Sequence, residues 1–351
     1  VMPGFQNITT FKTNNIGEDL SASATDFFAS SRATGLSRYV SVSLPGVPNL
    51  SRKRTLFNRS ALVSTNSLWK VKNGEFKAQV DYSFNRVTAQ AANITTYFLE
   101  SGDRVITENR DGRDRSHSLS GKFIYEVNQK TTFINNTLST NIDWDDVRLR
   151  VTGSLPNDQS AKLPDYYVAN KFKMIKRFNG KHLVTFQSNN EWESLPQTLN
   201  VSLEGNNIRQ HIGDYAFYTH ESAAYAFSIK GITVSLEGGV KGYLRSLNTE
   251  LPDMPEEIPG ETENVLNTNY FTVYATPKFE YWVKRVNFTL NAPVSFAHYT
   301  FDKALANRSE VYFSPSLSMN WKPNNRFSMT LRGGTCLLYT SDAADEARSV
   351  D

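Results

Sequence analysis

The chain has 351 residues, of which 39% are hydrophobic and 21% are charged, with a formal net charge of +3 at pH 7. This length is sufficient for one large sheet or a sizeable core. The near-balanced charge, without basic runs interleaved with aromatic residues, argues against a nucleic-acid partner, and no stretch approaches the roughly 18 apolar residues of a membrane helix.

Residues 1–53 are predicted to form an extended region with one or more early strands and a loop. The first ten residues, VMPGFQNITT, lack the basic and apolar segments of a signal peptide. Any export signal is therefore expected upstream of them.

Residues 75–85 alternate between apolar and polar side chains. Phe76 and Val80 are predicted on one face of a strand and Lys77 and Asp81 on the other, because successive side chains of a strand point to opposite faces. Eleven residues, at about 3.3 Å each and a tilt of about 45°, span roughly 25 Å, the height of the apolar band of an outer-membrane barrel. Strands of globular proteins are usually about five or six residues long.

The same alternation recurs as far as residue 331 and predicts an all-β fold. The expected architecture is an antiparallel up-and-down transmembrane β-barrel, of which this chain supplies about a dozen strands. The apolar rows lack Lys, Arg, Asp and Glu, as expected where a basic residue at the bilayer midplane costs about 2–4 kcal/mol. The residues predicted to face lipid are Phe76, Val80, Phe123, Val234 and Phe288. Those predicted to face a water-filled lumen are Lys77, Asp81, Lys122, Glu126, Glu237, Lys241, Lys278 and Glu280.

The predicted connections are of two kinds. Short turns are indicated at residues 72–74, 128–129, 179–180, 230–231, 284–285 and 322–325. Long polar loops are predicted at residues 89–113, 145–165, 193–214, 246–267 and 297–307. Short and long connections in alternation are typical of outer-membrane barrels, with short periplasmic turns and long extracellular loops.

A few residues do not fit the barrel pattern. Pro277 and Pro315 fall within apolar rows. Since proline cannot donate to a ladder, each predicts a bulge or a strand that has left the membrane. Asn136, Asn170 and His117 are polar residues on rows predicted to face lipid.

Residues 54–334 are predicted to form the barrel portion, and residues 335–351 a non-native tail. The string CLLYTSDAADE within this tail breaks the alternation and resembles the translation of an adapter used to prepare sequencing libraries. The one cysteine, Cys336, lies in it, so disulfides and thiolate metal sites are not expected elsewhere.

The sequence offers no arrangement that predicts catalysis or metal binding. The five histidines (His117, His182, His211, His220 and His298) do not form an H-x-x-x-H or H-E-x-x-H motif. The acidic clusters at residues 109–114 and 143–146 do not match an EF-hand, and solvated loop charge is the favoured interpretation. The acidic segment at residues 250–263 is interpreted in the same way, with gating or binding of a cationic ligand as the alternative. The seven N-x-S/T triplets are attributed to a chain rich in Asn, Ser and Thr, and the protein is predicted to be neither an enzyme nor a cofactor-binding protein.

Two segments resemble parts of TonB-dependent receptors, which are large outer-membrane β-barrel proteins. The segments are RTLFNRSALVSTNSLWKVKNGEFKAQVDY (residues 54–82) and SNNEWESLPQTLNV (residues 188–201), and the resemblance is to the branch with a carboxypeptidase-regulatory-like domain. The likeness covers residues 54–331. Full-length members have a plug domain inside a 22-stranded barrel, so the resemblance implies an internal slice of the barrel. It also implies energised uptake of a large or scarce ligand across the cell outer membrane. The partners implied are outer-membrane lipid, the protein's own plug domain, the TonB complex and a surface lipoprotein.

Two alternatives remain open. One is a passive outer-membrane pore or an adhesin barrel without TonB coupling, which the presence of an upstream plug and TonB-pairing segment would exclude. The other is a soluble carbohydrate-binding β protein, in which two stacked sheets bury the apolar rows between them. A dispersed monomer in the absence of detergent would favour this second alternative.

Overall fold

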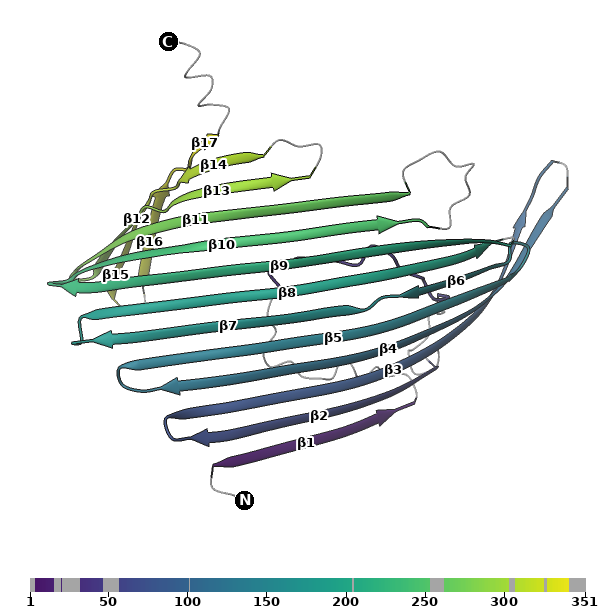
Figure 1. The fold of residues 1–351 in the computed structure, drawn as a ribbon, viewed down its shortest axis with the longest axis horizontal. Coiled ribbons are helices and arrows are strands. Elements are labelled where there is room, and N and C mark those ends of the chain that lie inside the picture. Colours follow the sequence, from purple (N-terminus) through teal and green to yellow (C-terminus); the bar gives the residue numbers. More distant parts are fainter. Residues whose placement is uncertain are drawn as a thin grey trace, which may run out of the picture.

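The computed structural model describes residues 4–15, 20, 32–46, 57–100, 102–203, 205–252, 262–302, 307–324 and 327–340. These residues form 17 strands that belong to one sheet (Figure 1). The strands are β1 (Phe5–Asn14), β2 (Phe57–Val71), β3 (Gly74–Tyr97), β4 (Arg104–Asn128), β5 (Thr132–Gly153), β6 (Asn157–Lys162), β7 (Asp165–Phe178), β8 (His182–Leu203), β9 (Asn206–Ile229), β10 (Ile232–Glu250), β11 (Glu263–Val283), β12 (Val286–Asn291), β13 (Val294–Phe301), β14 (Arg308–Phe313), β15 (Ser316–Asn324), β16 (Phe327–Gly334) and β17 (Leu337–Thr340). Within the described part of the chain, no helix has the length and apolar character needed to span a bilayer.

The sheet is antiparallel and runs up and down, which confirms the predicted all-β fold class. Four passes across it are each divided into two strands. For example, β6 and β7 lie end to end, and both pair with β5 on one side and β8 on the other. Three further passes are divided in the same way, into β12 and β13, β14 and β15, and β16 and β17. The 17 described strands therefore make 13 passes.

Prolines explain most of these interruptions. Pro164, Pro293 and Pro315 lie in the gaps between β6 and β7, β12 and β13, and β14 and β15. The interruption predicted at Pro315 is therefore present. Pro277 instead lies within β11, and its carbonyl accepts a hydrogen bond of 3.1 Å from the Ala292 amide in the gap between β12 and β13. The N–H and C=O groups of one strand residue point to the same side of the strand. The position where Pro277 lacks an N–H therefore faces the gap between β12 and β13, where no strand residue needs that donor.

Five of the predicted short turns lie where the sequence places them; at the sixth, residues 322–325, β15 continues to Asn324, and residues 325–326 lie outside the described residues. Lys230 and Gly231 form the two-residue connection between β9 and β10, and both have positive φ (48° and 84°), as in a type I′ hairpin turn. Asn179 and Gly180, between β7 and β8, have φ of 44° and 67°. These turns set the register in which the two neighbouring strands pair.

The prediction of long loops at the opposite ends of the strands is wrong for residues 89–113, 145–165 and 193–214. β3 and β4 are 24 and 25 residues long and continue as a hairpin beyond the rest of the sheet (Figure 1). The connections at residues 251–262 and 302–307 are shorter than predicted, and residues 253–261, most of the acidic segment, lie outside the described residues. In the predicted tail, β17 pairs with β14, and residues 341–351 lie outside the described residues.

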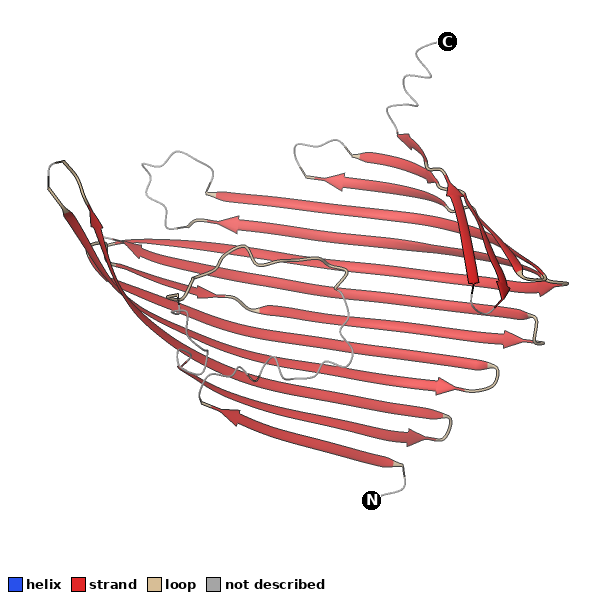
Figure 2. Ribbon diagram, turned by 180° about the vertical axis from the view of Figure 1, so that it is seen from behind, coloured by secondary structure: helices blue, strands red, loops and turns tan. Residues whose placement is uncertain are grey.

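Residues 32–46, which we name the strap, cross one of the two faces of the sheet (Figure 2). We name this face the inner face and the opposite one the outer face. The sheet bends so that β12, β15 and β16 curve towards the side of the strap (Figures 1 and 2). An apolar cluster lies under the strap, where Val40 and Val42 pack against Val147, Leu149 and Val151 of β5.

Candidate functional site

The strand register separates the residues selected from the sequence into two sets. Residues directly opposite each other in a pair share a face, and the apolar residues lie on the outer face and the charged residues on the inner face. The outer-face set is Phe76, Val80, Phe123, Val234 and Phe288. The inner-face set is Lys77, Asp81, Lys122, Glu126, Glu237, Lys241, Lys278 and Glu280. The five apolar residues are not interleaved between two sheets, because all described strands belong to one sheet.

The inner-face residues fall into separate groups. Lys77, Lys122 and Glu126 line a groove of about 600 Å³ that also contains Lys171 and Lys173. Further along the sheet, the ammonium group of Lys241 lies 5.4 Å from the ring centroid of Tyr274, and the Tyr274 hydroxyl donates a hydrogen bond of 3.0 Å to Glu237. Lys278 forms an ion pair with Glu280. Asp81 is buried and accepts a hydrogen bond of 2.7 Å from Gln79. The inner face is therefore a charged surface with a basic groove.

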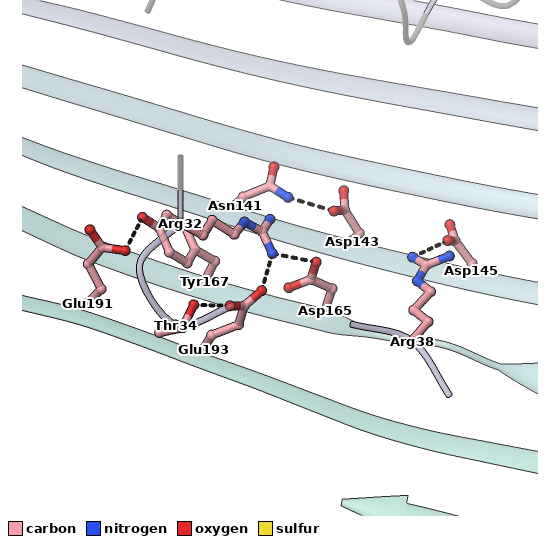
Figure 3. Close-up of polar contacts among 10 residues, drawn as sticks. All are labelled: Arg32, Thr34, Arg38, Asn141, Asp143, Asp145, Asp165, Tyr167, Glu191 and Glu193. Atoms are coloured by element: carbon pink, nitrogen blue, oxygen red, sulfur yellow. Dashed lines mark hydrogen bonds and ion pairs between the residues drawn. The ribbon is translucent and has the colours of Figure 1, made fainter. Parts of the chain in front are cut away.

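The strap is held on the inner face by carboxylates from neighbouring strands (Figure 3). Arg32 binds Asp165 of β7 at 2.8 Å and also forms an ion pair with Glu193 of β8. Its guanidinium lies 4.6 Å from the ring centroid of Tyr167. The buried hydroxyl of Thr34 donates a second hydrogen bond to Glu193, whose side chain is 1% exposed. Glu193 thus has both a charged and a neutral donor, as a buried carboxylate requires.

Glu191, two residues before Glu193, holds the strap backbone. It accepts hydrogen bonds from the Ala33 amide at 2.7 Å and from the Tyr167 hydroxyl at 3.1 Å. It also forms an ion pair with Lys171 at 3.1 Å. Residues two apart in a strand share a face, so β8 presents two adjacent carboxylates to the same turn of the strap.

The middle of the strap has a second set of anchors. The buried Gln197 side chain accepts hydrogen bonds from the Tyr39 and Val40 amides at 2.9 and 3.2 Å. The Tyr39 hydroxyl donates to Asp214 at 2.9 Å, and Arg245 binds the same carboxylate at 2.8 and 3.1 Å. Burial and the hydrogen bond to Asp214 raise the pKa of the Tyr39 hydroxyl, so it remains protonated and able to donate at neutral pH.

A third anchor lies at Arg38, which binds Asp145 of β5 at 2.5 Å. In the same cluster, Asp143 accepts a hydrogen bond of 2.5 Å from Asn141, and Asp146 binds Arg148 at 3.1 Å on the outer face. The carboxylates of the cluster at residues 143–146 are therefore divided between the two faces and engaged by other side chains. Among the described residues, no group of three or more His, Cys, Asp or Glu side chains is arranged to hold a metal ion.

The sequence did not identify the strap or the carboxylates that bind it. Glu193 and Asp214 lie at the two ends of a segment that the sequence predicts as a loop, whereas both are strand residues. The string EWES already contains a signal, because Glu191 and Glu193 flank Trp192, which lies on the outer face. Two carboxylates on either side of an outward aromatic residue indicate a strand with a strongly acidic inner face.

The outer face also contains a charged residue that the sequence pattern did not predict. The apolar row of β9 continues past Tyr225 to Glu221, which accepts hydrogen bonds from Ser188 at 2.7 Å and from Asn190 at 2.9 Å. On β5 and β7, the predicted exceptions Asn136 and Asn170 bind each other at 3.1 Å. These pairings satisfy the polar groups locally and lower the cost of placing them among apolar side chains.

We predict that Gly239→Ala destabilises the sheet by about 1–3 kcal/mol, because the added methyl group overpacks the inner face. A Cβ at Gly239 would lie 2.6 Å from the Glu221 carbonyl oxygen and 2.7 Å from the Tyr274 hydroxyl oxygen. The displaced Tyr274 would lose its hydrogen bond of 2.7 Å to His220. Thermal unfolding in detergent measures the effect. Gly213→Ala is the matched control because a Cβ there has no atom within 4 Å, and an equal loss in both variants would contradict this account.

Comparison with known proteins adds no assignment to this geometry. No family model matches the chain, and a search of curated proteins also finds no match.

Proposed function

We propose that the protein forms part of the wall of an outer-membrane β-barrel of the TonB-dependent receptor type, which mediates energised uptake of a large or scarce ligand. The outer face contacts lipid, and the inner face lines the lumen. The observation that carries the proposal is the single sheet, whose apolar face is not covered by any other described element. Leu236, Phe271 and Phe296 on this face are 54%, 48% and 45% exposed. Soluble monomers rarely expose a contiguous apolar surface of this extent, whereas lipid solvates it.

The backbone supports the same conclusion. A membrane has no water to satisfy unpaired N–H and C=O groups, so strands cross it only where each is paired on both sides. β2 to β5 and β8 to β11 are long strands paired along most of their length with both neighbours. In a complete barrel, the strands at the two edges of this sheet would pair with further strands.

The strap favours transport of a ligand that does not diffuse through an open channel. It occupies the inner face through ion pairs and hydrogen bonds to β5, β7, β8 and β9. A channel obstructed in this way conducts a large solute only when the obstruction moves. The resemblance of residues 54–82 and 188–201 to TonB-dependent receptors supports energy from the TonB complex for that movement.

A second candidate function is a passive pore narrowed by its own loop. The observation for this candidate is that the strap belongs to the segment between β1 and β2 and is bound to the wall, as a constriction loop is. Planar-bilayer recordings and uptake assays distinguish the two functions. A pore conducts ions without an energy source, whereas TonB-coupled uptake stops when the proton gradient is dissipated.

The membrane location is tested by fractionation of cells that express the chain with an export signal. We expect the protein to sediment with outer membranes, to resist extraction by salt and to dissolve only in detergent. A monodisperse, cooperatively folded protein in detergent-free buffer would contradict the proposal and favour the soluble β protein.

A further inference from the structure

A row of arginines crosses the outer face beyond the apolar band. Arg59 of β2 lies directly opposite Arg86 of β3, which in turn lies directly opposite Arg115 of β4. Among the described residues, none of the three forms an ion pair or a side-chain hydrogen bond. The row continues across the sheet to Asp146 of β5 and Lys162 of β6.

A second basic row lies next to the first, one step further from the apolar band. Arg113 of β4 is directly opposite Arg148 of β5. The Nε and Nη2 atoms of Arg113 are buried and have no hydrogen-bond partner among the residues that the structure describes. The neighbouring groove, of about 680 Å³, is lined by Arg113, Arg148, Arg150 and Arg209, with Asp111 and Asp158.

The charges on this surface, named the basic belt, do not balance. On β2 to β6, the basic residues of the two rows and the groove are Arg59, Arg86, Arg113, Arg115, Arg148, Arg150 and Lys162. The acidic residues are Asp111, Asp146 and Asp158, of which Asp146 and Asp158 are already paired with Arg148 and Arg150 at 3.1 and 3.0 Å. Like charges directly opposite each other destabilise an antiparallel pair. Anions that bind at this part of the outer face would therefore stabilise the folded sheet.

The position of the basic belt identifies the source of these anions. Two residues nearer the apolar band along β3, β4 and β5, Phe84, His117 and Trp144 form a row of rings on the outer face, opposite one another in register. Arg86 and Arg115 therefore lie about 7 Å beyond the rings, since a strand rises about 3.3 Å per residue. In a membrane-spanning sheet, aromatic rings lie at the interface, so the basic belt lies at the level of the lipid headgroups.

We propose that the basic belt binds the phosphate groups of lipid headgroups in the leaflet at the long-hairpin end of the sheet. The inference rests on the proposed membrane location. Arginine suits this role because its planar guanidinium donates two parallel hydrogen bonds to phosphate oxygens. Bound phosphates neutralise the Arg59, Arg86 and Arg115 row.

The test compares two lipids that differ only in phosphate. The full chain in zwitterionic detergent is unfolded thermally with added lipid A, a glucosamine lipid with two phosphates, or with its dephosphorylated form. We expect lipid A to raise the melting temperature by about 4 °C and the dephosphorylated lipid to have little effect. In the triple variant Arg59→Gln, Arg86→Gln and Arg115→Gln, most of the rise is lost. Without lipid A, this variant is at least as stable as the parent, because the like charges are gone.

A charge-matched control is provided by Lys70→Gln, Lys72→Gln and Lys181→Gln, which remove three exposed positive charges near the short turns. This variant keeps the full response to lipid A. An equal response to both lipids, or an equal loss in both triple variants, would overturn the inference while leaving the membrane location intact. A chain that is dispersed and folded without detergent would instead overturn the proposed function.

Discussion

Val80→Arg is expected to lower the free energy of unfolding of the protein in phospholipid vesicles by about 2–4 kcal/mol, the cost of a basic residue near the middle of a bilayer. Val80 lies on the outer face of β3, six residues from the first residue of that strand and opposite Gly121 of β4. An arginine there has no acidic neighbour in the adjacent strands, because Thr65 is its opposite residue on the other side. Urea titration followed by tryptophan fluorescence measures the loss.

The adjacent substitution Gln79→Arg is the matched control. Gln79 lies on the inner face of the same strand, and its side chain donates a hydrogen bond of 2.7 Å to Asp81, which can also accept from arginine. We expect a change within about 1 kcal/mol, because the inner face is polar and Asp81 supplies an acceptor. Equal losses at positions 79 and 80 would show that the two faces have the same environment and would contradict lipid contact at the outer face.

The second large effect is expected from Arg32→Ala, which removes the cation that binds Asp165 and Glu193. Removing one member of a buried ion pair costs about 3–5 kcal/mol. Because Arg32 is 31% exposed and Thr34 still donates to Glu193, we expect the strap to be destabilised by about 2–3 kcal/mol. Amide hydrogen exchange at Ala33 and Tyr39 should then be faster by about 30- to 150-fold.

Two variants make this measurement specific. Arg32→Lys keeps the positive charge and should restore part of the protection, whereas Arg38→Ala removes a more exposed ion pair and should have a smaller effect. Unchanged exchange in Arg32→Ala would show that the apolar contacts of Val40 and Val42 hold the strap without the ion pairs. In planar bilayers, release of the strap should increase ion conductance.

The division into two faces could be predicted from the sequence because it depends on a local rule. Side chains alternate between the two faces of any strand, so the faces of Phe76, Val80 and Lys77 follow without knowledge of the neighbouring strands. The rule predicts the faces only as far as each apolar row extends. Glu221 lies on the continuation of the row of Tyr225 and is paired with polar groups of β8. Such a residue is detected only when the register of the adjacent strand is known.

The long strands were missed because their polar ends do not alternate in hydropathy. The pairing of β3 with β4 extends over 23 residue pairs. Its outer part lies beyond the apolar band, where both faces of a strand contact water and no hydropathy period remains. Composition alone then predicts a loop. The strap was missed for the opposite reason. Val40, Val42 and Leu44 alternate with serines as in a strand, yet this segment is unpaired and packs against β5.

The strap also determines how strongly a ligand must bind to reach the carboxylates beneath it. It is part of the chain between β1 and β2, so its binding to Asp165, Glu193 and Asp214 is intramolecular and independent of protein concentration. A tethered segment of this kind competes at an effective concentration of roughly millimolar. A cationic solute would therefore saturate the inner face only if it were abundant, or if it engaged several carboxylates at once. The inner face would then select solutes by how well they compete with the strap for these carboxylates.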